Sequence, residues 1–385
     1  MRRRSIFALF ATAAALLVPW LVGPLLPDLV CVAIVAVGLF FLPGMIAGDA
    51  AGLTLHDGAE SVASAFTFSL ALLAPGLLIA LASGTGVTTV VIILLLSCAL
   101  LARYGAARPA VATHSDGERG DAAAAGLGLV TVTLLTMITL TAAAVAVTRT
   151  GSVDRWWYLG YVRAWANGPF FTHEPFLGTD FVQPRFAFHT WLGALSVWAR
   201  LSGVDALWLF DRACPALLMP LAFAAHFMFG RALFRTARGA WLTALCAGLL
   251  WAGGGPIAAM TRLPEDKVLA AVVLSPALWA FGIRACERGG TWTIATALAA
   301  AAIATIHPLG FLLSAGPLVV FCAIRAWTAS ACTATSKNRA SSARRSLEAC
   351  RRSTGLSRSW GTGSVTSPWR STSVRMGCTS ACINT

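Results

Sequence analysis

The chain has 385 residues, of which 57% are hydrophobic and only 12% are charged, and its mean hydropathy is +0.73. This composition excludes an ordinary soluble globule and predicts an integral membrane protein that contacts membrane lipid. The net charge of +13 does not indicate nucleic-acid binding, because the region 329–385 alone carries nine Lys and Arg residues against one acid. Much of the remaining positive charge lies at the ends of apolar runs, where it sets membrane topology.

Helix-length apolar blocks recur along the chain and predict an all-α transmembrane bundle of about ten spans. Runs of about 20 apolar residues match the hydrocarbon layer of a bilayer, and the short alternating segments of a membrane barrel are missing. The candidate spans are 5–23, 29–48, 61–83, 87–103, 124–147, 206–229, 240–251, 268–285, 291–306 and 309–327. The first is interpreted as an uncleaved span, because it lacks a clear small-residue cleavage site.

Three arginines, Arg2 to Arg4, precede the first span and predict a cytoplasmic N-terminus. Five crossings then place the polar segment 148–204 on the extracytoplasmic side. The arginine cluster within 231–238 returns to the cytoplasm only if the stretch 188–201 does not cross the bilayer. We therefore expect a multi-pass protein of the cell membrane with both termini in the cytoplasm.

Two helices are expected to lie in the membrane interface within this large outer loop. The first covers 154–167, where aromatic residues recur every fourth position on one face. Its aromatic stripe consists of Trp157, Tyr161 and Trp165. The second covers 188–201 and would hold Trp191 and Trp198 at headgroup level. An ordinary aromatic belt without a catalytic role is the alternative interpretation of these side chains.

Three regions follow from this reading of the chain. Residues 1–123 form a four-span membrane region with a cytoplasmic loop, and residues 124–328 form a membrane core that contains the outer loop 148–204. Residues 329–385 form a basic tail rich in Ser, Thr and Arg, which we expect to be disordered because it has no periodic apolar face. The change in composition before this tail has two explanations, a genuine cytoplasmic tail or a truncated or out-of-frame gene.

The 10 cysteines form no CxxC pair and show no Cys/His spacing typical of a metal site. Several of them lie inside apolar runs, including Cys31, Cys98, Cys246 and Cys322. We interpret them as small hydrophobic residues of the core.

Three polar features that are far apart in the sequence fall on the outer face in this topology. Asp154 follows the fifth span, the run 264–267 (PEDK) precedes the eighth, and His307 follows the ninth. We expect them to share one site, because ionisable groups gathered at a membrane boundary are functional candidates. Asp154 can accept a proton or bind a hard cation, and it can equally cap the helix that begins there.

Other polar side chains are candidates for contacts with a substrate. The candidate phosphate contacts are Arg155, Arg163 and Arg185, since guanidinium groups bind phosphate oxygens in pairs. The candidate supporting residues are His173, Glu174, Asp180, Glu265, Asp266, Lys267 and His307. The first three of these lie in a turn-rich loop that could surround a divalent metal ion, but their spacing matches no metal motif, so cofactor and metal stay open. Solvated loop or span-end charges are the alternative interpretation.

The pattern DRWWYLGYVRAWANG, followed by a Pro- and Gly-rich loop and then RFAFHTWLGALSVWARLSGVD, resembles the first extracytoplasmic loop of the GT-C class of multi-pass glycosyltransferases. The resemblance covers residues 124–327. It implies transfer of a sugar from a polyprenyl-phosphate donor at the outer face, with Asp154 matching the acid of the family's loop as base or metal ligand. The family often uses paired acids for a metal, whereas Arg155 follows Asp154 here, so the resemblance does not decide metal dependence.

Two other functions remain alternatives. A transporter or flippase predicts paired broken helices and an internal repeat, and the stretch 253–256 could break a helix. A non-catalytic, truncated membrane protein is the other alternative, because the basic tail stands where the family usually has a soluble domain or further spans.

Overall fold

The computed structural model describes residues 2–53, 57–107, 127–147, 153–170, 175–176, 186–252, 260 and 262–353, and within them it contains helices and no strands. Eight helices in this part of the chain are long and apolar enough to cross a membrane. They are Ser5–Val22, Asp28–Ala51, Gly58–Ser83, Val87–Gly105, Gly128–Val147, Ala206–Phe234, Asp266–Arg288 and Pro308–Thr328. The predicted all-α membrane fold is confirmed.

The two remaining predicted spans, 240–251 and 291–306, form shorter helices of 16 residues each, α11 (Ala237–Ala252) and α15 (Thr291–Ile306). Residues 1–327 form one compact unit and residues 328–385 a second.

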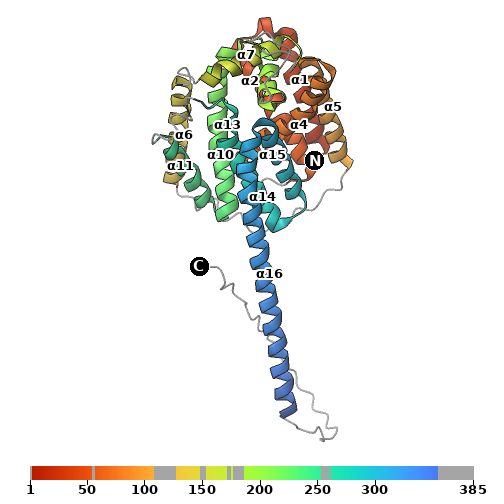
Figure 1. Cartoon of the computed structure of the whole chain (residues 1–385), viewed down its shortest axis with the longest axis vertical. Coiled ribbons are helices and arrows are strands. Elements are labelled where there is room, and N and C mark those ends of the chain that lie inside the picture. Colours follow the sequence, from red (N-terminus) through yellow and green to blue (C-terminus); the bar gives the residue numbers. More distant parts are fainter. Residues whose placement is uncertain are drawn as a thin grey trace, which may run out of the picture. The chain divides into compact units, whose positions relative to one another are not determined.

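The first unit is built around α4 (Gly58–Ser83), which packs against helices from both halves of the unit. The preceding helices are α1 (Arg2–Val22), α2 (Asp28–Phe40) and α3 (Leu42–Ala51), and α5 (Val87–Ala107) follows. Gly44 allows α3 to approach α4 closely, because a Cβ there would lie 1.8 Å from the carbonyl oxygen of Ala65. Helix α6 (Leu127–Val147) packs against α10 (Cys214–Phe234) and α11 (Figure 1).

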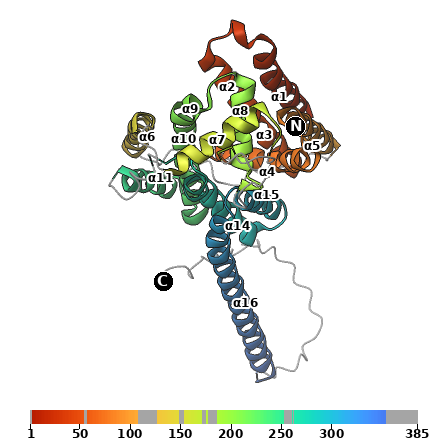
Figure 2. The same ribbon diagram turned by 45° about the horizontal axis from the view of Figure 1, so that its top comes forward.

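The segment predicted to form the outer loop contains two short helices, α7 (Val153–Asn167) and α8 (Thr190–Ser202), which lie against each other (Figure 2). Neither is long enough to cross a bilayer. Trp191 and Trp198, which were expected at headgroup level, contact protein and not lipid, because both are buried in the protein core. Trp198 donates a hydrogen bond to the carbonyl of Val32 at 2.9 Å, so α8 presents its aromatic residues to α2.

The inward face of α7 also differs from the predicted stripe. Tyr158, Tyr161 and Trp165 are buried, whereas Trp157 is only partly buried. The periodicity therefore identifies an apolar face, but this face contacts protein.

Two spans begin with the same unusual geometry. In the first, α9 (Ala206–Trp208) and the π-helical turn η5 (Leu209–Ala213) precede α10. In the second, α13 (Asp266–Leu269) and the π-helical turn η6 (Ala270–Leu274) precede α14 (Ser275–Arg288).

A proline accounts for each π turn. Pro215 and Pro276 lie at the start of α10 and α14, where they remove an N–H donor and push away the carbonyl four residues earlier. The residue before each proline donates instead to the carbonyl five residues back, from Cys214 to Leu209 and from Ser275 to Ala270. The widened turn is the geometry of a π bulge.

A second set of ion pairs lies at the opposite end of the bundle from α7. Fully buried Glu60 pairs with Arg284, and Glu287 accepts hydrogen bonds from Arg235 at 2.6 Å and Arg325 at 2.8 Å. All these residues belong to the span ends that the arginine pattern assigns to one side of the membrane. The packing therefore fits the predicted alternation of span directions.

Helix α16 (Pro308–Ser353) contains the last predicted span and continues beyond it. Residues 329–353 of the tail that the sequence predicts to be disordered belong to this helix, and 354–385 lies outside the described residues. Ala, Arg and Lys favour helix, and a helix that extends an existing one avoids the cost of nucleation. The cysteine interpretation also needs correction, because Cys286 of α14 and Cys322 of α16 form a disulfide.

Candidate functional site

Asp154 lies in the first turn of α7 and contacts two cations from the segment before α13 and from α13 itself. Its Oδ2 is 2.6 Å from Nζ of Lys267 and 2.9 Å from Nη2 of Arg262. The three side chains are about equally exposed, at 33% for Asp154, 34% for Lys267 and 30% for Arg262. The structure therefore brings Asp154 and the end of the PEDK run together at a partly exposed surface.

Glu265 lies beneath these side chains and is only 1% exposed. Both of its oxygens accept from Nε of Arg262, at 2.9 and 2.8 Å, and one oxygen is 3.4 Å from Nζ of Lys267. These hydrogen bonds to Glu265 raise the pKa of Arg262, so this arginine is a fixed cation. Two carboxylates and two cations form a cluster whose formal charges cancel. Below we call Asp154, Arg262, Glu265 and Lys267 the outer charge cluster.

Asp266, the next residue, is buried and connects three elements. Its Oδ1 accepts from the hydroxyl of Tyr158 at 2.6 Å, and its Oδ2 is 3.3 Å from Nε2 of His189. Nδ1 of His189 accepts the backbone N–H of Leu192 as the cap of α8, so Nε2 carries the proton and donates to Asp266. Tyr158 lies one turn after Asp154 on α7. Asp266 therefore holds α7 and α8 against α13.

The indole of Trp191 adds a second link between α8 and the segment before α13. Its Nε1 donates to the carbonyl of Pro264 at 2.7 Å. The backbone that carries the outer charge cluster is thus held by buried contacts on the side facing the core. Side chains fixed in this way keep their positions when a neighbouring group moves.

The arginines expected to contact phosphate have other partners. Arg155 is buried and pairs with Asp211 of η5, and Arg163 pairs with Asp205 through two contacts of 2.9 Å. Partial burial acts to raise the pKa of Asp205, but the hydrogen bond and charge of Arg163 and the backbone N–H groups of Leu207 and Trp208 together outweigh burial and lower this pKa. Neither arginine belongs to the outer charge cluster, and their role in binding phosphate stays a prediction.

His307 lies between α15 and α16 and acts as a cap, because its Nδ1 accepts the N–H of Gly310 at 2.8 Å. A Cβ on Gly310 would lie 3.3 Å from the Cβ of Ala270, which follows Asp266 by four residues. His307 is therefore near the end of the bundle that carries the outer charge cluster, and its imidazole has a structural role there. The other predicted residues lie outside the described residues; they are His173, Glu174, Asp180 and Arg185.

The outer charge cluster does not fit a divalent metal. Within the described part of the chain, no group of three or more His, Cys, Asp or Glu side chains could hold a metal ion. The two acids of the cluster, Asp154 and Glu265, already contact Arg262 and Lys267, whose positive charges oppose a metal ion at the same position. Cations in this arrangement are suited to an anionic ligand.

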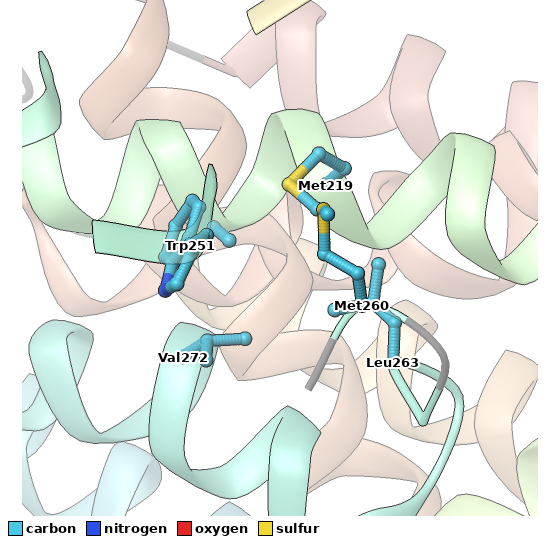
Figure 3. Close-up of a pocket in the computed structure, with 6 residues that line it drawn as sticks. Met219, Trp251, Met260, Leu263 and Val272 are labelled. Atoms are coloured by element: carbon cyan, nitrogen blue, oxygen red, sulfur yellow. The ribbon is translucent and has the colours of Figure 1, made fainter. Parts of the chain in front are cut away.

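A small apolar hollow lies at the meeting of several of these elements (Figure 3). Its lining residues come from α10, α11, η6 and the segment before α13; they are Met219, Ala222, Trp251, Met260, Leu263 and Val272. Leu263 is the direct neighbour of Arg262. One segment of the chain therefore contributes both to the hollow and to the outer charge cluster.

No family model, curated protein or solved structure matches this chain. Arg262 is the functional candidate that sequence reasoning missed. Its spacing of three residues before Glu265 was the available signal, because this spacing brings two side chains together in a tight turn or on a helix.

Proposed function

We propose that this integral membrane protein transfers a sugar from a polyprenyl-phosphate donor to an acceptor hydroxyl at the extracytoplasmic face. One observation carries the proposal: a partly exposed carboxylate, Asp154, lies within hydrogen-bond distance of two cations. The carboxylate supplies a base, and the cations suit a phosphate. The resemblance of the loop sequence to GT-C enzymes points to the same chemistry.

In the proposed reaction, Asp154 takes the proton of the acceptor hydroxyl. The acceptor oxygen forms a bond to the anomeric carbon of the sugar, and the bond between that carbon and the phosphate oxygen breaks. The electron pair of the broken bond leaves with the polyprenyl phosphate. Arg262 and Lys267 stabilise the negative charge that develops on this leaving group. These two residues replace Arg155 and Arg163 as the proposed phosphate contacts.

The test is incorporation of labelled sugar from a polyprenyl-phosphate donor by the full chain in phosphatidylcholine nanodiscs. We expect Asp154→Asn to lower the rate at least about 100-fold, as loss of a general base does. Asp205→Asn is the matched control, because Asp205 pairs with an arginine but lies outside the cluster. Equal rates for Asp154→Asn and wild type would refute the catalytic role of Asp154.

Translocation of a substrate is a second candidate function, and a specific observation favours it. Two spans carry matching π turns, η5 and η6, directly beside charged residues, as paired interruptions do in transporters. Flipping of a lipid-linked sugar in proteoliposomes, without transfer of the sugar, would favour this function over the first.

A further inference from the structure

The carboxylate of Asp154 occupies the position that suits an external anion. Its Oδ2 bridges Lys267 and Arg262 at 2.6 and 2.9 Å, which are the distances of charge-assisted hydrogen bonds. A phosphate oxygen makes the same contacts with the same two residue types. The two cations are each about one-third exposed, so an anion from outside can reach them.

We propose that Asp154 is an internal anion that fills a phosphate-ester site until a bound phosphate displaces it. The inference rests on the proposed function for its catalytic meaning, but the binding event stands by itself. In the empty protein Asp154 closes the site, and in the occupied protein the phosphate holds both cations. Displacement then leaves the carboxylate beside the phosphate, where the acceptor hydroxyl must arrive.

The surroundings of the cluster allow this exchange. Buried Glu265 binds Arg262 from below through both of its oxygens and lies 3.4 Å from Lys267. The two cations therefore stay in place when Asp154 moves away. Asp154 lies in the first turn of α7 and is one-third exposed, so a change in its side-chain rotamer can separate its carboxylate from Lys267 and Arg262.

The exchange couples donor binding to base activity. A carboxylate held by two cations is a poor proton acceptor, because protonation would discard both ion pairs. Once a phosphate takes these cations, Asp154 loses its contacts with Arg262 and Lys267 and has a negative charge beside it. Asp154 therefore becomes an effective base only when the donor is present, and an acceptor hydroxyl is not deprotonated in its absence.

The internal anion must also weaken binding of external anions, and this effect can be measured. We expect Asp154→Asn to tighten binding by about tenfold, or ~1.4 kcal/mol, because it removes two partly exposed ion pairs that compete with the ligand. The probes are inorganic phosphate and, in a separate arm, a polyprenyl phosphate in phosphatidylcholine nanodiscs, each titrated by calorimetry. Tightening in both arms identifies a general phosphate site, and tightening only in the second identifies a lipid headgroup site.

Two further variants complete the experiment. Lys267→Gln should weaken binding of the same probe about tenfold, and Asp205→Asn, which alters an exposed ion pair outside the cluster, should leave affinity unchanged. Unchanged or weaker binding by Asp154→Asn would overturn the inference. If Asp154→Asn does not fold, the inference is overturned instead when Lys267→Gln binds the probe as tightly as the wild type does.

The two proposals fail in different ways. Tighter phosphate binding without any sugar transfer by wild type would retain the anion exchange and reject the transferase. Transfer that depends on Asp154, with no change in phosphate affinity in Asp154→Asn, would retain the transferase and reject the exchange.

Discussion

The substitution Asp266→Asn changes one buried oxygen into an amide nitrogen. One side of Asp266 accepts from the hydroxyl of Tyr158 at 2.6 Å, and the other accepts from Nε2 of His189. An asparagine can keep the first hydrogen bond through its oxygen. Its NH2 group then faces the Nε2–H of His189, and the ring cannot change tautomer without losing the cap to Leu192.

Two donors would therefore face each other inside the protein. Loss of a hydrogen bond to a charged acceptor, with a donor left unsatisfied, costs about 2–3 kcal/mol. A cost of ~1 kcal/mol lowers the unfolding midpoint by roughly 2–4 °C in a protein of a few hundred residues, so we expect a fall of about 5–10 °C.

The assay is thermal unfolding of the purified full chain in one detergent, followed by loss of the monodisperse peak in size-exclusion chromatography. His189→Ala provides the second arm of a double-mutant cycle. In that background Asp266→Asn should cost less than about 1 kcal/mol, because the opposing donor is gone. If Asp266→Asn causes the whole expected loss of stability in both backgrounds, or no loss in either, the assignment of the hydrogen bond between His189 and Asp266 is refuted.

Two further predictions concern other charged residues. Arg155→Ala leaves Asp211 buried without the cation that pairs with it and should cost about 3–5 kcal/mol in the same unfolding assay. Arg163→Ala breaks an exposed pair and should cost less than about 1 kcal/mol. Equal losses would contradict the difference in burial. Burial, with the neighbouring Glu60, raises the pKa of Asp57 above its ordinary value of 3.8. The contribution of Asp57 to the free energy of unfolding therefore falls as pH rises through the interval above 3.8. Asp57→Asn keeps the cap to Glu60 and should be slightly more stable than wild type at neutral pH, with the difference vanishing in acid; lower stability at neutral pH would contradict this.

The spans could be predicted because a bilayer requires long apolar runs, and this requirement is visible in the sequence. The number of predicted crossings between Asp154 and the PEDK run also placed both on the same side of the membrane. The structure brings Asp154 and Lys267 into contact. Neither inference needs knowledge of side-chain packing.

The partners of individual charges could not be predicted. Arg155 is exposed in any local reading of α7, and its partner Asp211 is 56 residues away at a π turn created by tertiary packing and a proline. The surroundings of the aromatic residues of α8 could not be predicted for a related reason. Periodicity shows which face of a helix is apolar, but it does not distinguish lipid from protein as the neighbour of Trp191 and Trp198.

The disulfide between Cys286 and Cys322 joins α14 to α16 across a sequence separation of 36 residues that contains α15. Because of this bond, α14 and α16 cannot slide past one another by a helical turn. A rearrangement near Asp266 must therefore either move α14 and the linked part of α16 together or be absorbed before Cys286. The π turn η6 lies between Asp266 and α14, where such a rearrangement would be absorbed.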